Sequence, residues 1–320
     1  MKKIFLIALL LALACPAQCI ANQVIVVSGP PIAESVPLIA MSQKTQSWDQ
    51  PFDLKFLPWH SPDMLRAMIV GGQIDAAIIT TAAASTLHNK GINVRIAQLY
   101  ESPIWIVSNR PGPDTLESLK GTLLFPFGPG EMPELLFKAT LKDNPTEISI
   151  RHTSGALEAV NLLLAGKGEH AMLSEPTVSV AILRSQEKHS QGSPLLVRRI
   201  SMGKVWTRTF PGHRLASTSM TFFRSKAENP DMIQHFRKAH TQACEWVKQN
   251  PSKALTLTRQ KFPALAAQLD SGAIKKIDIH TLNNQRARKN AIFFLSKIKE
   301  LSPDAIGGPI PKNDLFEVGQ

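Results

Sequence analysis

Hydrophobic and polar positions follow two different periods along this chain. Short apolar runs predict strands, at 24–27, 52–57, 74–79, 94–99, 104–107, 123–127, 148–151 and 171–173. Between them, apolar residues recur every three to four positions and predict helices, at 36–41, 62–70, 81–90, 132–139, 156–165 and 176–186. Strands that alternate with helices are typical of a parallel α/β sheet.

The last third of the chain has a different pattern. The segments 195–209 and 217–223 are interpreted as extended chain that returns to the first half of the fold. Beyond Pro230 the pattern is helical, at 231–249, 251–261, 265–282 in pieces, and 286–301. After Gly307 the chain is expected to be a loose tail.

One stretch of this pattern occurs twice, 94 positions apart. Residues 67–82 correspond to residues 161–176, and the pairs Gly72/Gly166 and Ala77/Ala171 are identical. Each copy holds an apolar helix end, a glycine stop, an acid three residues later, a short strand and a hydroxyl residue. The repeat predicts two similar α/β lobes whose ligand edge lies at the carboxyl ends of the strands. The alternative is that any two helix–glycine–strand units look alike.

The length of 320 residues allows one large core or two medium ones. The turn Asn109–Pro113 is interpreted as the crossing into the second lobe. We therefore assign residues 22–107 to the first lobe and 108–209 to the second. Residues 210–320 are expected to return to the first lobe and form C-terminal helices.

The start of the chain predicts export. Lys2 and Lys3 precede the apolar run 4–14, which is too short to span a bilayer, and cleavage is expected after Ala21. The mature chain is therefore expected to be a periplasmic protein without a membrane anchor. The alternative is lipidation at Cys15, whose upstream residues fit a lipid-attachment sequence poorly.

After cleavage the chain keeps one cysteine, Cys244, which is expected to be a buried apolar group in a helix. The net charge of +11 becomes +9 when Lys2 and Lys3 are removed. The basic residues are scattered, and Arg286–Lys289 form the densest group. For an exported chain this pattern indicates a solvated surface that attracts anions, and no nucleic-acid partner is expected.

Six loops follow predicted strands and open predicted helices. The candidate ligand-binding residues in them are Ser28, Gly29, Trp59, His60, Ser61, Thr80, Thr81, Gly128, Gly130, Glu131, Thr153, Ser154, Ser174 and Glu175. Helix N-termini offer unpaired N–H groups and a positive dipole end, which suit a carboxylate, sulfonate or phosphate. Each Ser or Thr alone is more simply a helix cap. Six such loops at one edge of a two-lobed fold favour a shared cleft.

Two acids and an aromatic residue refine this hypothesis. Glu131 and Glu175 either satisfy their own helix starts or select a cation or an N–H donor such as an aminopyrimidine. Trp59 ends a strand and enters a loop, where its ring can stack on a ligand. Thr80 and Thr81 are predicted to face Ser174 and Glu175 across the cleft.

Nothing in the sequence indicates catalysis. A nucleophile elbow, a phosphate-binding Gly-x4-Gly-Lys loop and a dinucleotide fingerprint are all missing. His235 and His240 are five residues apart and share a helix face poorly, so no metal site and no cofactor are expected. Glu175 with His60 or Ser154 is a loose catalytic candidate at most.

Four segments, in this order, resemble one protein family: 36–42, 65–91, 164–176 and 229–254. They are similar to the periplasmic solute-binding proteins of the nitrate/sulfonate/taurine class of ABC importers, which also includes binders of thiamine-pyrimidine precursors. The likeness covers nearly all of the mature chain. Two segments depart from the family pattern. Gln43–Gln50 lacks a glycine-bearing turn, and Gly128–Glu131 replaces a serine-rich one.

The resemblance implies a two-lobed type II periplasmic binding protein with a C-terminal helical extension. It implies a monomer that captures a small anionic or heteroaromatic metabolite between its lobes and delivers it to an ABC permease. The two departures weaken nitrate or an alkylsulfonate as the ligand. The alternative is an exported enzyme or a ligand-sensing module on the same fold.

Overall fold

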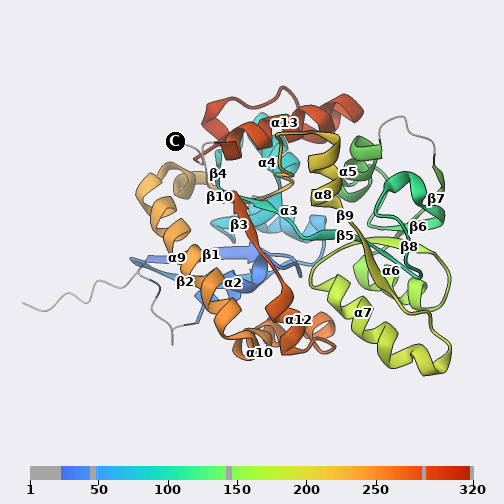
Figure 1. The fold of residues 1–320 in the computed structure, drawn as a ribbon. Helices are drawn as coiled ribbons and strands as arrows, with labels where there is room; N and C mark the ends of the chain where they lie inside the picture. The colour runs from blue at the N-terminus through green and yellow to red at the C-terminus, as the bar shows by residue number, and fades with distance from the viewer. Residues whose placement is uncertain (1–22, 44–47, 49, 142–145, 283–285, 318–320) are drawn as a thin grey trace, which may run out of the picture.

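The structure is a computed structural model that describes residues 23–43, 48, 50–141, 146–282 and 286–317. Two mixed β-sheets lie side by side, each covered by helices (Figure 1). The predicted leader 1–21 and Cys15 lie outside the described residues, as does most of the segment Gln43–Gln50. No helix in the described ranges combines the length and the apolar character that a membrane span needs.

The first sheet has the order β11–β4–β10–β3–β1–β2 and defines lobe I. Its strands are β1 (Gln23–Gly29), β2 (Phe52–Pro58), β3 (Ala76–Thr80), β4 (Val94–Glu101), β10 (Thr218–Phe223) and β11 (His280–Leu282). Its helices are α2 (Ser35–Met41), α3 (Pro62–Val70), α4 (Thr81–Asn89), α9 (Pro230–Gln249), α10 (Pro251–Lys261), α11 (Pro263–Ala266), α12 (Ser271–Lys276) and α13 (Arg286–Leu301).

The second sheet has the order β7–β6–β8–β5–β9 and defines lobe II. Its strands are β5 (Ile104–Ser108), β6 (Lys120–Pro126), β7 (Glu147–Thr153), β8 (His170–Ser174) and β9 (Val197–Ser201). Its helices are α5 (Met132–Leu141), α6 (Ala156–Leu164), α7 (Thr177–Lys188) and α8 (Met202–Thr209). Five 3-10 turns complete the described elements: Leu116–Ser118, His189–Gln191, Arg224–Glu228, Pro303–Ile306 and Asn313–Leu315.

The central strands, such as β3, β8 and β10, are buried on both faces, which explains their continuous apolar runs. In β6, Leu123 and Phe125 belong to a core cluster that extends through both lobes, whereas Leu124 belongs to a second cluster on the other face. In β1, Ile25 and Val27 pack in a third cluster beneath α2 and α9. Alternate residues of one strand therefore serve opposite helical layers.

The two lobes repeat one topology, as the sequence predicts. Strands β2–β1–β3–β10–β4 of lobe I correspond to β7–β6–β8–β5–β9 of lobe II. Helices α3 (Pro62–Val70) and α6 (Ala156–Leu164) are offset by 94 residues, and so are strands β3 (Ala76–Thr80) and β8 (His170–Ser174). The sequence repeat thus marks a structural repeat, and the lookalike alternative is wrong.

The repeated acid has the same structural task in each lobe. Asp75 Oδ2 accepts a hydrogen bond from Val26 N at 2.8 Å, and Glu169 Oε2 accepts one from Thr122 N at 2.6 Å. The backbone N–H of each acid also donates back, to the carbonyl oxygens of the same Val26 and Thr122. Each acid therefore joins a helix–strand turn to the neighbouring parallel strand.

The first crossing between the lobes differs from the predicted one. β5 pairs with β8 and β9, so Ile104–Ser108 already belongs to lobe II. The chain crosses at Ser102–Pro103 rather than at the turn Asn109–Pro113. Periodicity could not show this, because an apolar run looks the same whichever of the two sheets its strand joins.

The conformation of the segment before the return to lobe I also differs from the predicted one. Residues 195–209 are not a continuous extended segment: β9 pairs with β5 in lobe II, and Met202–Thr209 form helix α8. The Ser201 hydroxyl caps this helix by accepting from Lys204 N. β10 then pairs with β3 and β4, which confirms that 217–223 returns to the first sheet.

The C-terminal segment is not a loose tail where it is described. Asn89 Nδ2 donates to the carbonyl oxygens of Ile306 and Pro309, both at 2.8 Å. Phe316 is fully buried and forms a bridge with Ile96 of β4. Anchored backbone and a buried aromatic ring hold residues 307–317 against lobe I.

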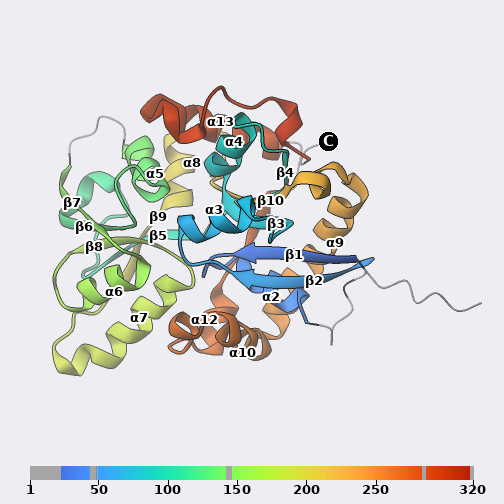
Figure 2. The same ribbon diagram turned by 180° about the vertical axis from the view of Figure 1, so that it is seen from behind.

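Helix α13 lies across both lobes. It passes over α4 of lobe I and reaches α5 and α8 of lobe II, as views from opposite sides show (Figure 2). Trp206 of α8 is fully buried, and its ring centroid lies 6.1 Å from that of Phe293 and 5.6 Å from that of Phe294 in α13. The shared core cluster therefore joins the lobes on this side.

Candidate functional site

The carboxyl ends of β1, β2 and β3 form one edge of lobe I, and both crossings between the lobes start or end there. In β1, Ser28 is fully buried and its hydroxyl donates to Leu57 O at 2.7 Å. At Gly29 an added Cβ would collide with Ser35 Oγ. Ser28 is thus a strand-to-strand tie, and Gly29 permits close packing of the loop that follows.

The loop after β2 holds the three residues Trp59, His60 and Ser61. Trp59 N donates to Gly29 O at 3.1 Å, so the ends of β1 and β2 stay together. The Trp59 ring packs against the shared core, and its Nε1 is buried without a partner among the described residues. His60 is exposed, and its ring lies edge-on to Phe262. Ser61 caps α3 by accepting from Met64 N, as predicted.

The loop after β3 begins helix α4. Thr80 Oγ1 accepts from Ala83 N at 3.1 Å and is the helix cap. Thr81 is buried, and its hydroxyl donates to Ala216 O at 2.7 Å. Thr81 N also donates to Ser217 O, which fixes α4 against the returning chain. Ser217 Oγ, in contrast, is buried and has no partner among the described residues.

A buried polar cluster joins the two crossings. Ser102, on the first crossing, bonds to Glu34 Oε1, and its hydroxyl lies 2.7 Å from Thr218 Oγ1 on the second. Glu34 is fully buried at the start of α2, and its Oε2 has no partner in the described chain. Burial raises the pKa of Glu34, and the Ser102 hydrogen bond opposes this only in part.

Behind this cluster lie three further buried titratable groups. The Tyr100 hydroxyl is 3.2 Å from His240 Nε2, and Cys244 Sγ is 3.7 Å from His240 Nδ1. Burial raises the pKa of Tyr100 and that of Cys244, the latter to about 12, and lowers the pKa of His240 to about 4. Cys244 is therefore the inert buried group that the sequence predicts.

In lobe II the equivalent edge begins at the loop after β6. Gly128 and Glu131 are exposed, and Gly130 has φ of 76°, which suits glycine. Gly130 N donates to Glu134 Oε2 at 2.8 Å. Glu134 is buried, accepts from His152 Nε2 at 3.0 Å and pairs with Lys138. Burial opposes ionisation, but these hydrogen bonds lower the pKa of Glu134 to about 2.

The loop after β7 contains Thr153 and Ser154. The Thr153 hydroxyl bonds to the carbonyl oxygens of Phe125 and Gly155. Ser154 is exposed, and both its backbone N–H and its hydroxyl donate to Glu158 Oε2, each at 2.6 Å. These hydrogen bonds lower the pKa of Glu158.

The loop after β8 contains Ser174 and Glu175. Ser174 is half-buried at the strand end. Glu175 Oε2 accepts from Ser179 N at 3.1 Å and Ser179 Oγ at 2.8 Å. Its Oε1 accepts from Nε and Nη2 of Arg198, at 3.1 and 2.8 Å. The buried Glu175 carboxylate therefore caps its own helix and holds an arginine.

The two lobe edges touch at this loop. Ala33 N, in the loop after β1, donates to Glu175 O at 2.8 Å, and Glu175 N donates to Pro103 O at 3.0 Å. On the lobe I side, Thr80 pairs with Thr218, which lies within hydrogen-bond distance of Ser102. The loop after β3 and the loop after β8 are therefore connected by a series of short contacts through the two crossings.

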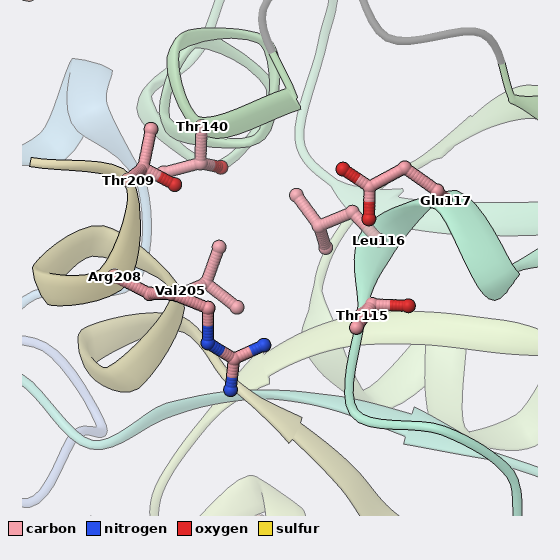
Figure 3. Close-up of a pocket in the computed structure, with 7 residues that line it drawn as sticks. All are labelled: Thr115, Leu116, Glu117, Thr140, Val205, Arg208 and Thr209. Carbon is pink, nitrogen blue, oxygen red and sulfur yellow. The ribbon is translucent and has the colours of Figure 1, made fainter.

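One hollow of the surface lies away from this edge. A pocket of about 300 Å³ on lobe II opens between α5, α8 and the turn Leu116–Ser118 (Figure 3). Its rim carries Arg208, which is exposed and paired with Asp114. None of the predicted site residues lines this pocket.

Several residues of the interlobe edge carry no recognisable sequence signal. Glu34 and Ser102 lie in segments without a recognisable motif. Ser217 precedes a strand whose pattern predicts only a return to lobe I. Glu134 and Glu158 are each the third residue of their helix, where an acid is an ordinary first-turn residue. Within the described residues, no three His, Cys, Asp or Glu side chains are grouped to hold a metal ion.

No protein-family model matches the sequence, and no curated protein matches it. Solved structures do resemble it. An ABC transporter protein of Parabacteroides distasonis has a TM-score of 0.72 at 21% identity, over 93% of this chain and 100% of that one. The aliphatic sulphonate-binding protein SsuA of Escherichia coli has a TM-score of 0.65 at 14% identity, over 93% and 96%. The nitrate-binding protein NrtA of Synechocystis has a TM-score of 0.60 at 13% identity, over 88% and 82%. The chain therefore has the two-lobed α/β fold of type II periplasmic binding proteins, with a helical C-terminal region.

Proposed function

We propose that this protein is the extracytoplasmic solute-binding subunit of an ABC importer. In this role it captures a small anionic or heteroaromatic metabolite between its lobes and delivers it to a membrane permease. The proposal rests on one observation. The carboxyl-end edges of the two sheets are equivalent, and they meet at Ala33 and Glu175, beside the two chain crossings. Ligands of open α/β sheets bind at this kind of edge.

The structural neighbours support the same role. One is described as the ligand-binding component of an ABC-type import system, and two as periplasmic binding proteins, for aliphatic sulphonates and for nitrate. The leader-like residues 1–21 support export. The resemblance to this class of protein supports action as a monomer. Ligand capture would close the lobes about Ser102–Pro103 and the returning chain before β10.

The residues proposed to line the site are those of the facing loops. Trp59 offers a ring on the lobe I side, and Thr80 and Ser174 offer hydroxyl groups at equivalent strand ends. Four other candidates form hydrogen bonds within the protein, and their proposed role is to shape the loops: Ser28, Thr81, Thr153 and Glu175.

Thermal unfolding of the purified protein with a panel of sulfonates, carboxylates, oxyanions and pyrimidines tests the proposal. A solute that binds only the folded state raises its stability, by about 2.7 kcal/mol at a 100-fold excess over the dissociation constant. Trp59→Phe should reduce the shift caused by the binding solute. Trp246→Phe, a matched change at a ring that packs against Trp48, should leave it intact. A panel without any shift would contradict the proposed function.

A further inference from the structure

The two sheets of the described chain end in four edge strands, and three of them carry features that discourage pairing with another chain. β2 has the exposed Lys55 at its centre and Pro58 at its end. β11 has only three residues, and β9 has a register shift against β5. β7 has none of these features. It contains no proline or lysine, and its register with β6 is continuous over all seven residues.

The outer edge of β7 is open. β7 is the terminal strand of the lobe II sheet and lies at the outer margin of the molecule in views from opposite sides (Figures 1 and 2). Four of its first five residues are exposed, and Ile150 is 39% exposed although it is apolar. A regular edge strand with an exposed apolar side chain and unpaired N–H and C=O groups is a template for a further strand.

The sequence of β7 is complementary to itself in the antiparallel direction. Residues 147–151 are Glu-Ile-Ser-Ile-Arg. When two copies pair about a two-fold axis at Ser149, Glu147 faces Arg151 of the second copy, and Ile148 faces Ile150. Directly opposed residues of antiparallel strands lie on the same face of the sheet. Acid therefore meets base on one face, and isoleucine meets isoleucine on the other.

The backbone fits the same register. Along a strand, the N–H and C=O groups of alternate residues point to opposite neighbouring strands. In this register every residue faces either itself or a residue two or four positions away in the sequence. Groups that point away from β6 in one copy therefore meet groups that point away from β6 in the other, as an antiparallel ladder requires.

The charged side chains are available for this pairing. Arg151 is exposed, and its side chain has no hydrogen bond or ion pair among the described residues. Glu147 pairs with Lys120 at 2.7 Å, but both side chains are more than half exposed, and such a pair is weak. Arg151 helps to stabilise the charge of Glu158 in α6. Positive and negative groups would thus alternate across the paired strands.

We propose that β7 pairs antiparallel with β7 of a second copy of this chain, with Ser149 on the two-fold axis, so that the two lobe II sheets join. Such an interface is isologous and closes at two copies. It uses a strand of seven residues, whereas stable interfaces have roughly 20–30 residues a side, so the dimer is weak and exchanges with the monomer. None of the predicted site residues lies within 147–151. Each copy therefore captures its solute by itself, and the pairing does not depend on the proposed function.

Sedimentation velocity of the mature protein, up to its highest soluble concentration, tests the pairing. Wild type should change from monomer to dimer as the concentration rises. Arg151→Glu places an acid opposite Glu147 at two symmetric positions and should weaken the dimer by about tenfold or more. Lys204→Glu, an equal change of charge at an exposed residue of α8, is the control and should leave the dimer intact. A wild type that stays monomeric, or equal effects of the two variants, would overturn the proposal while the proposed function stands.

A charge swap tests the register. Glu147→Arg alone should weaken the dimer as Arg151→Glu does. The double variant Glu147→Arg/Arg151→Glu again sets opposite charges against each other and should recover dimerisation to within about threefold of wild type. If both single variants lose the dimer and the double variant does not recover it, the two side chains do not face each other and the proposed register is wrong.

A disulfide across the axis tests the same register directly. The Cα atoms of opposed residues in antiparallel strands are about 4.5–5.5 Å apart, which a disulfide can span. Cys244 is buried and does not compete. Under mild oxidation, Ser149→Cys should form a linked dimer. Ser190→Cys, an exposed serine in the turn His189–Gln191, is the control and should remain monomeric. Equal linkage of the two variants, or none in Ser149→Cys, would overturn the proposal.

Discussion

At the scale of single residues, Glu175 shows how far an acid can be interpreted from sequence. Its place after a strand and before a helix allowed two roles, ligand contact or service to its own helix. The structure shows that both carboxylate oxygens are used, one by Ser179 and one by Arg198. The difference depends on Arg198, 23 residues away on β9, which no local pattern could connect to Glu175.

Glu34 carries a prediction about pH. Its pKa in the folded protein is raised above 4.5 by burial, so the folded state holds the proton more tightly than the unfolded chain. This stabilising contribution is complete below pH 4.5 and is lost as the pH rises through the folded pKa. Glu34→Gln keeps an uncharged group in place at every pH. It should therefore remove the loss of stability that the Glu34 carboxyl causes as the pH rises. The facing groups Tyr100, Ser102, Thr218, His240 and Cys244 are the same in both proteins.

Urea unfolding of wild type and Glu34→Gln at pH 4 and pH 7 measures this effect. The free energy of unfolding of the variant, relative to wild type, should increase between the two pH values. A constant difference between the two proteins would show that the carboxyl does not change its charge in this range.

At the scale of elements, the 94-residue repeat predicts more of the fold than hydrophobic periodicity does. It placed α3 with α6 and β3 with β8, because the glycine stop and the acid fix the spacing from helix to strand. The crossing at Ser102–Pro103 and the helix Met202–Thr209 were missed, since sheet pairing and tertiary burial, not local spacing, decide them. The C-terminal segment was missed because its order comes from Asn89 and Ser85, more than 200 residues earlier.

The repeated acids make a paired prediction. Asp75→Ala and Glu169→Ala each leave a strand N–H without its side-chain acceptor, Val26 N in one lobe and Thr122 N in the other. Each change should lower the free energy of unfolding by about 1–3 kcal/mol. Neither should alter solute affinity, because these acids precede their strands and lie at the edge opposite the candidate site. Asp53→Ala on β2 is the control, and equal stability losses in all three variants would contradict the assigned role.

At the scale of the whole molecule, the two lobes do not meet only at the crossings. Ala33 and Glu175 join the strand-end edges, and Val180 of α7 packs within the lobe I core cluster. On the other face, α13 connects α4 to α5 and α8. A closing movement therefore has to keep or exchange apolar contacts on both sides of the crossings.

This arrangement predicts how the molecule unfolds. Phe294 of α13 is fully buried against Trp206 of α8, in the core cluster that extends through both lobes. Phe294→Ala should lower the free energy of unfolding by about 3–5 kcal/mol through the cavity that it leaves. Because the lost contacts join the lobes, the variant should also unfold less cooperatively than wild type.

Tryptophan fluorescence and far-UV circular dichroism in urea should give coincident transitions for wild type and separated ones for the variant. Phe236→Ala in α9, a buried ring within lobe I, is the matched control and should lower stability while the transitions stay coincident. If Phe294→Ala also keeps coincident transitions, α13 is not what couples the two lobes.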